Sequence, residues 1–194
     1  MVARTTDPRT RPALLEAASR LFYREGVGAV AVDNVAAASG LSKPTLYRHF
    51  DSKEMLVAAY LEQRHDRLTA DLRAAIEAAP PERRPVAVID SLCASILEPG
   101  FTGCAFVRAY AENQRDLETG ERLRRRKQVL VETIAQACRD AGAGRPDELA
   151  AQLALIVEGA TTMAYATGKR RQAVDAARAV AAAVLREAGL GVER

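Results

Sequence analysis

The spacing of apolar residues constrains this chain more than any other feature of its sequence. Apolar side chains recur every three or four residues along nearly the whole chain, and no stretch alternates convincingly as a strand would. The segments between them are marked by Gly and Pro, which end helices and form turns. The sequence therefore predicts an all-α protein.

The apolar pattern divides into nine predicted helices. Thr10 can cap the first, and Asp51 with Glu54 has the spacing of a capping box that starts the fourth. The predicted helices cover residues 10–25, 32–39, 43–50, about 52–78, 84–97, 104–113, 118–141, 146–167 and 171–187. We expect a three-helix head in residues 1–55, joined by the long fourth helix to a larger body in residues 56–194.

The composition limits the class of protein further. Apolar residues make up 48% of the 194 residues and charged residues 27%, as in an ordinary soluble globular protein. No run approaches the roughly 18 uncharged apolar residues that a membrane span needs, and the N-terminus lacks the apolar stretch of a secretory signal. We therefore expect a cytoplasmic protein with no membrane partner.

The cysteines and histidines are few and scattered. Cys93, Cys104 and Cys138 form no CxxC pair, and the two histidines are His49 and His65. Reduced thiols in a cytosolic protein fit this pattern better than a disulfide framework or a zinc site. We expect no metal and no cofactor.

Residues 32–50 have the pattern of a helix-turn-helix. Two short helices that cross steeply need small residues at their contact and a glycine in the turn, and Ala36, Gly40 and Leu41 meet this need. Leu46 and Phe50, four residues apart, would anchor the second helix on the core. The side chains left on its surface can contact phosphates or base edges: Lys43, Thr45, Tyr47, Arg48 and His49.

The distribution of charge is consistent with such a head. Residues 1–50 hold seven Lys or Arg and four Asp or Glu, so the net charge of +3 for the whole chain lies in this first quarter. A weak basic excess at one end fits a nucleic-acid-binding head on a neutral body, although alone it would establish nothing.

Many spaced positions together resemble the signature of the tetracycline-repressor family, over about residues 9–60. The matching residues are Leu14-Leu15-Glu16-Ala17-Ala18, Phe22, Gly26, Val35-Ala36, Gly40-Leu41-Ser42, Thr45-Leu46-Tyr47-Arg48-His49-Phe50 and Lys53-Glu54. Pro44-Thr45-Leu46-Tyr47 followed by His49 is especially similar to the recognition helix of the tetracycline repressor itself.

The resemblance implies a recognition helix that lies in the major groove of DNA. It places Lys43, Pro44, Thr45 and Arg48 nearest the bases, and Tyr47, His49 and Lys53 toward the phosphate backbone, with Ser42 also among the DNA-binding residues. One position departs from the family: Ala31 stands where a threonine usually caps the second helix and contacts phosphate. Losing such a cap typically costs ~1 kcal/mol, which Asp33 could partly offset through the helix dipole.

The family also implies a function and partners. Its members are one-component transcriptional regulators that bind palindromic operator DNA as homodimers and respond to a small organic effector. Repression is the expected direction, because blocking a promoter needs no further domain, and activation is the alternative within the same family.

The last two predicted helices offer a dimer surface, because small residues at helical spacing let helices approach closely. The alternative is that these residues form only a core within one chain. The candidate interface residues are Leu153, Ile156, Ala160, Ala164, Ala176, Val180, Ala183 and Val184.

An effector pocket is expected in the body, where Pro99 to Cys104 interrupts the helical pattern and aromatic and polar residues follow. Each candidate could instead belong to the core or the surface. The candidates are Phe101, Cys104, Phe106, Arg108, Tyr110, Glu112, Met163 and Tyr165.

Two further segments suggest other functions. The six residues Arg122 to Lys127 look like a nucleic-acid patch, but Leu123, Leu130 and Ile134 continue an apolar stripe through them, so the cations are expected largely on a solvated face. Cys104 at a helix start could be the nucleophile of a small helical enzyme, but the sequence shows no Cys/His/acid constellation or phosphate-binding glycine loop. A third possibility is an interaction protein whose head binds DNA without specificity.

Overall fold

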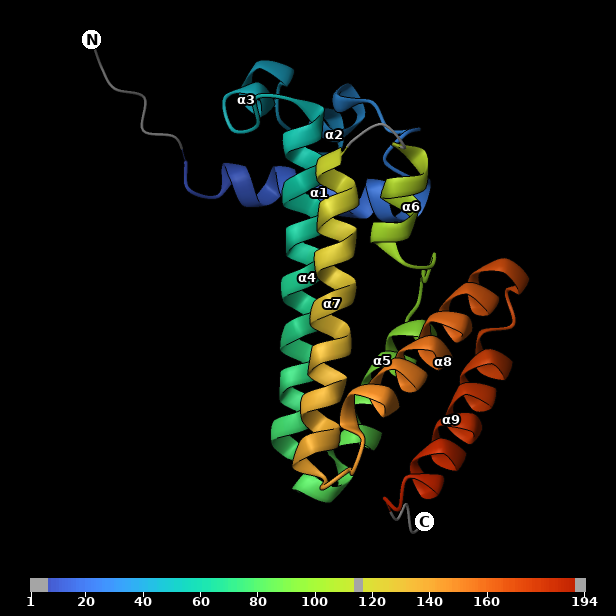
Figure 1. The fold of residues 1–194 in the computed structure, drawn as a ribbon. Coiled ribbons are helices and arrows are strands. Elements are labelled where there is room, and N and C mark those ends of the chain that lie inside the picture. Colours follow the sequence, from blue (N-terminus) through green and yellow to red (C-terminus); the bar gives the residue numbers. More distant parts are fainter. Residues whose placement is uncertain (1–6, 114–116, 191–194) are drawn as a thin grey trace. The chain divides into compact units, whose positions relative to one another are not determined.

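The structure is a computed structural model that describes residues 7–113 and 117–190. Within these residues it contains nine α-helices, one 3-10 helix and no strand, which confirms the predicted all-α class (Figure 1). The elements are α1 (Thr10–Glu25), α2 (Val32–Ser39), α3 (Lys43–Tyr47), α4 (Lys53–Ala78), η1 (Pro81–Arg83), α5 (Arg84–Leu97), α6 (Ala105–Glu112), α7 (Leu117–Asp140), α8 (Pro146–Thr167) and α9 (Arg170–Glu187).

The chain divides into two compact units. The first contains the residues up to His65 together with 105–120, and the second contains 66–104 together with the residues from Glu121 onward. The division lies within α4, and the predicted domain boundary at residue 55 stays a prediction. In addition, α6 belongs to the first unit, although the sequence placed it in the body.

The first unit has an apolar core to which α1, α2, α3 and the start of α4 contribute. The rings of Phe22 on α1 and Tyr60 on α4 meet edge to face, with centroids 5.6 Å apart and an interplanar angle of 63°. Aromatic pairs of this geometry stabilise a core beyond the area that they bury. The fully buried residues of this core include Leu14, Ala18, Val35, Leu46, Leu56 and Leu61.

The second unit is built around the antiparallel pair α8 and α9, which pack side by side and also contact α5 (Figure 1). Many of the buried contacts are made by alanines, such as Ala150, Ala160 and Ala177, and such small side chains let helix axes come close together. Gly168, with φ 69°, ends α8 in the left-handed conformation and allows the tight connection to α9.

By length and composition, α8 is apolar enough to cross a membrane, and it is the one such helix among the residues described. Leu149, Leu153 and Val157 on this helix are buried in the core of the second unit, and core helices commonly have this composition. The absence of a membrane partner stays a prediction.

The starts of two helices differ from the sequence prediction. Thr10 does not cap α1; instead, Asp7 accepts hydrogen bonds from the backbone N–H of Arg9 through Oδ1 (2.9 Å) and of Thr10 through its carbonyl (2.9 Å). Asp51 does not cap α4 either, because Ser52 Oγ accepts the N–H of Met55 at 3.2 Å. The hydroxyl of Ser52 stands three residues before that N–H, which is the spacing that a helix N-cap requires.

We predict that Ser52→Ala lowers the free energy of unfolding by about 1 kcal/mol, because it leaves the Met55 N–H without its acceptor. Asp51→Ala is the matched control and should change it by less than about 0.5 kcal/mol, as expected for an exposed position without such a role. Urea unfolding followed by circular dichroism measures both. Equal effects of the two variants would contradict the assignment of Ser52 as the cap.

Candidate nucleic-acid interface

The turn between α2 and α3 is built around Gly40. This glycine has φ 70° and donates its N–H into the last turn of α2, and the next N–H, that of Leu41, bonds to the Ala36 carbonyl at 3.0 Å. A residue with a Cβ rarely adopts this left-handed conformation, so the glycine allows the sharp change of direction. Ser42 then leads into α3 in an extended conformation.

Ser42 fixes the start of α3 and connects to other candidate DNA-binding residues. Its hydroxyl accepts the Thr45 N–H at 3.3 Å and lies 2.8 Å from the Thr45 hydroxyl. The Arg48 guanidinium donates to that same Thr45 hydroxyl at 3.1 Å. The three polar side chains therefore form one hydrogen-bonded group that holds them in a common orientation.

Lys43 is paired with Asp33 across the two helices of the motif. The Lys43 Nζ lies 2.8 Å from Asp33 Oδ1, and the hydrogen bond to this carboxylate raises the pKa of Lys43. Asp33 sits in the first turn of α2, where Ala31 provides no side-chain cap, as predicted. We expected the carboxylate of Asp33 to interact favourably with the dipole of α2. The structure shows in addition that it pairs with Lys43 of α3.

The other candidate residues differ in exposure. Pro44 and Arg48 are exposed, Tyr47 is 41% exposed, and Lys53 is half-buried in the first turn of α4. His49 is half-buried, and its Nε2 is buried without a hydrogen-bond partner among the residues described. The contact of His49 with the phosphate backbone, which the family resemblance implies, stays a prediction.

Leu46 and Phe50 are buried at 0% and 3% exposure, which confirms their predicted place in the core. Arg11 was not among the candidates, yet its guanidinium carbon lies 5.0 Å from the centre of the Phe50 ring, so it adds an exposed cation near the end of the motif. No sequence signal indicated this contact, because it joins two residues that are almost forty positions apart.

The candidate dimer residues on α8 and α9 fall into two groups. Leu153 and Ala164 are almost fully buried and belong to the core of the same chain. Surface remains in different amounts on the others, which are Ile156, Ala160, Ala176, Val180, Ala183 and Val184.

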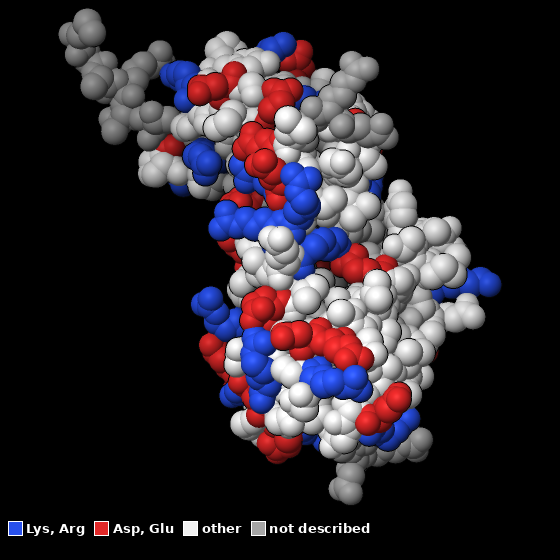
Figure 2. Space-filling view, in the orientation of Figure 1, with Lys and Arg blue, Asp and Glu red and all other residues white. Residues whose placement is uncertain are grey.

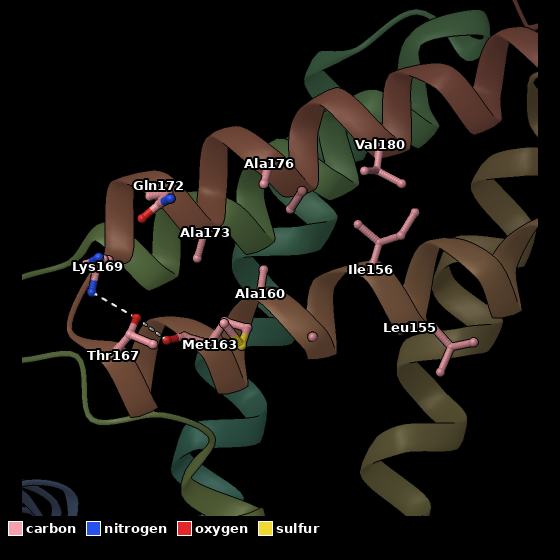
Figure 3. A pocket seen from close by; sticks show the side chains of 12 residues that line it. Leu155, Ile156, Ala160, Met163, Thr167, Lys169, Gln172, Ala173, Ala176 and Val180 are labelled. Carbon is pink, nitrogen blue, oxygen red and sulfur yellow. Dashed lines mark hydrogen bonds between the residues drawn. The ribbon is translucent and has the colours of Figure 1, made fainter.

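A shallow apolar groove of about 540 Å³ lies along α8 and α9. Figure 3 shows Ile156 and Ala160 of α8 and Ala173 and Val180 of α9 directed toward the space between the two helices. The groove also includes Met163, and the exposed fractions of Met163 and Val180 are 56% and 50%. The part of the surface formed by these helices is mainly uncharged (Figure 2).

Four of the candidate effector-pocket residues lie on α6, in the first unit. Phe106 is buried and Tyr110 is 40% exposed. Arg108 Nη1 donates to the Tyr23 carbonyl at 2.7 Å, and Glu112 Oε2 accepts the Gly28 N–H at 2.8 Å. Both polar side chains therefore fasten α6 to the end of α1 and to the turn that follows it.

Gly26 leaves space for the Glu112 carboxylate. The glycine has φ 98°, and a Cβ at this position would lie 2.4 Å from Glu112 Oε1. Any other residue would therefore be strained in its backbone and would displace the carboxylate.

The other four candidates lie in the second unit. Phe101 packs against the core, and Met163 lines the groove described above. Tyr165 is exposed, and its ring lies against Gly103, where a Cβ would be 3.2 Å from the ring. Cys104 is partly buried, and its Sγ lies 3.9 Å from Lys127 Nζ.

The cationic segment Arg122 to Lys127 is not wholly on a solvated face. Arg124 and Arg125 are exposed as predicted, but Arg126 is buried, with 6% exposure, so the prediction is wrong for this residue. Arg126 lies four residues before Leu130 and eight before Ile134, in line with the buried stripe of the helix. Among the residues described, no three His, Cys, Asp or Glu are grouped so that they could hold a metal ion.

Helix α3 follows a glycine turn, packs on the core through its apolar side and exposes its polar side. This is the arrangement of a helix-turn-helix DNA-binding protein. The comparisons with known proteins give the same class. The sequence model of the bacterial regulatory proteins of the tetR family matches residues 14–60.

Relatives match beyond the motif. The regulator UidR of Escherichia coli is 30% identical over 138 residues, which cover 68% of this chain and 66% of UidR. The transcriptional activator FasR of Mycolicibacterium smegmatis is 39% identical over 74 residues, which cover 38% of this chain and 34% of FasR. The crystal structure of a TetR-family transcriptional regulator from Streptomyces coelicolor superposes with a TM-score of 0.86 at 29% identity, covering 92% of this chain and 95% of that one.

This chain belongs to the TetR family of DNA-binding transcriptional regulators. The recognition from the sequence is thereby confirmed. The members of this family are regulators and not enzymes, so the reading of Cys104 as the nucleophile of a small enzyme is set aside.

We predict that Glu112→Ala speeds the hydrogen exchange of the Gly28 amide about tenfold or more, because a hydrogen bond to a charged acceptor contributes ~1.5–3 kcal/mol. Glu121→Ala, which removes an exposed carboxylate of α7, is the control and should leave this amide unchanged. The exchange is measured by NMR or by mass spectrometry of peptides that contain Gly28. Unchanged exchange in Glu112→Ala would show that the side chain does not hold α6 in place.

Proposed function

We propose that this protein is a one-component transcriptional repressor that binds a palindromic operator as a homodimer and leaves it when a small organic effector binds. The observation that carries the proposal is the helix-turn-helix of α2 and α3, within the part of the chain that matches the tetR family. Such a regulator acts in the cytoplasm, where its operator lies.

The side chains available on the motif support base reading as well as backbone contact. Lys43, Thr45 and Arg48 can donate to acceptors on base edges or to phosphate oxygens. The exposed phenol of Tyr47 and the ammonium of Lys53 suit phosphates, and Ser42 and Pro44 shape the start of the helix. His49 is half-buried, and its Nε2 is not available for a contact with DNA.

A single head of this size contacts too little DNA for useful specificity, so a second copy of the chain is the partner that we propose for the groove on α8 and α9. The groove is apolar, it continues the core of the second unit, and it exposes large side chains such as Leu155, Met163 and Val180. Contiguous apolar surface of this kind marks an interaction site in proteins that are otherwise charged at the surface.

The effector would act by linkage. A ligand that binds one conformation of the dimer better than the other shifts the DNA affinity by that difference, and DNA shifts the ligand affinity by the same factor. α6 is a suitable element for this coupling, because it follows Cys104 directly in the chain and holds the end of α1 through Arg108 and Glu112.

Activation is the second candidate, because the relative FasR is named as a transcriptional activator. The two directions differ in the effect of deleting the gene. Expression of the genes beside the operator rises on deletion if the protein represses them, and falls if it activates them.

A selection of bound duplexes from genomic DNA, at ~150 mM salt, tests the proposal. We predict an enriched palindromic site whose binding is weakened at least tenfold in Tyr47→Ala, because the exposed phenol is available to contact a phosphate. Tyr110→Ala removes an equally exposed tyrosine on α6 and is the control, which should keep the site. Binding without any enrichment would instead identify a nonspecific DNA-binding head.

The dimer interface has its own test. We predict that Val180→Glu converts the dimer to a monomer in size-exclusion chromatography with light scattering, because it would bury an unpaired carboxylate between the two chains. Val107→Glu is the matched control, since Val107 is 44% exposed and lies on α6, outside the groove. A dimer that persists in Val180→Glu would place the interface elsewhere.

A further inference from the structure

Among the residues described, the second unit has one charged side chain that is buried, that of Arg126. Arg126 on α7 is 6% exposed and makes no hydrogen bond or ion pair within residues 7–113 and 117–190. An arginine stays protonated in proteins, so a positive charge is carried here by a side chain that is largely buried. A buried charge without a partner destabilises a protein by several kcal/mol, which makes its retention here unusual.

The groups around Arg126 offset its charge only in part. Glu158 on α8 is the nearby carboxylate, but it is engaged by Lys127 Nζ. Cys104 lies within electrostatic reach of Arg126, and its Sγ is 3.9 Å from the same Lys127 Nζ. With two cations, one carboxylate and one thiol, the cluster has an excess of one positive charge when the thiol is protonated.

The cluster is accessible at its edge. The side chains of Lys127 and Glu158 are 31% and 34% exposed, and Cys104 is partly exposed as well. The residue before Cys104, Gly103, lies against the ring of Tyr165, so an aromatic surface borders the chain at this point. A largely buried cation and an aromatic neighbour are the elements that bind a small molecule with an acid group and an apolar part.

We propose that Arg126, with Lys127 and Cys104 at its edge, binds the acid group of a small organic anion, and that the effector of this regulator belongs to that class. The first part stands on the cluster alone, and the second part rests on the proposed function. The guanidinium would donate to the acid group in the fork geometry that suits carboxylates and phosphates. The negative charge of the ligand would then balance the excess positive charge of the cluster.

Cys104 offers a direct probe of this site. Cys93 and Cys138 are fully buried, and burial raises the pKa of both thiols, that of Cys138 to about 11. Disulfide reagents will therefore react first at Cys104 in the folded protein. Dithiobis(nitrobenzoate) is an aromatic disulfide with a carboxylate on each ring, and dithiodipyridine is an aromatic disulfide without charge. The Cys104 thiolate attacks one sulfur, forms a mixed disulfide and releases the other half of the reagent as a coloured thiolate.

The measurement is the ratio of the two labelling rates, anionic reagent over neutral reagent, at ~150 mM salt. The ratio cancels changes in the reactivity of the thiol itself. We predict that it falls about tenfold in Arg126→Met, which removes the charged donor at similar side-chain length. In Arg124→Met, which removes the same charge from an exposed position two residues earlier, it should fall less than about twofold. Cys104→Ser should abolish the fast labelling.

The melting temperature of Arg126→Met separates a binding role from a structural one. Removal of an unpaired buried charge should leave the melting temperature equal or higher. A marked drop would show that the arginine serves the fold and would overturn the proposal, as would an unchanged rate ratio in a folded Arg126→Met protein. These assays contain no DNA, so their outcome is independent of the operator selection that tests the proposed function.

Discussion

The burial of Leu46 is the interaction on which the DNA-reading surface depends. α3 comprises the five residues Lys43–Tyr47, and a helix this short has no stability of its own in water, where about 12–15 residues are marginal. Its position is therefore set by tertiary contact, with Leu46 at 0% exposure and Phe50 at 3% in the core of the first unit. The polar side chains around Leu46 lie on the helix that this contact positions, and hydrogen bonds join Ser42, Thr45 and Arg48. They inherit their orientation from one apolar anchor and from the hydroxyl of Ser42.

A second set of contacts makes α6 part of the head. Arg108 donates to the Tyr23 carbonyl in the last turn of α1, and Glu112 accepts the Gly28 N–H after it, from a segment more than eighty residues away in the chain. A structural element inserted so late in the sequence is thereby tied to the helices that position α3. Neither the sequence of α6 nor that of α1 indicates by itself that the two segments are in contact.

The limits of sequence reasoning follow the same division between local and distant contacts. The helix-turn-helix was predictable, because its glycine turn, its apolar anchor at Leu46 and its polar surface all lie within twenty residues. The cap of α4 was missed by one residue, since Asp51 and Ser52 both can cap and only the backbone geometry separates them. The burial of Arg126 and the contacts of Arg108 could not be derived, because they depend on which face of each helix meets a distant neighbour. Arg126 lies in line with the apolar stripe that runs through Leu130, which is consistent with its burial. Its place within a run of cations favoured an exposed position instead.

The ion pair between Lys43 and Asp33 has a consequence for how the head searches DNA. A cation that faces only phosphates attracts the protein equally to every stretch of a chromosome, and this attraction grows with each uncompensated charge. Asp33 offsets one such charge at the motif itself, at 2.8 Å from Lys43 Nζ. The ion pair therefore lowers the affinity of the head for DNA of random sequence. A larger share of the binding free energy then comes from the groups that distinguish one base pair from another. Occupancy of a rare site among many wrong ones depends on that ratio more than on total affinity.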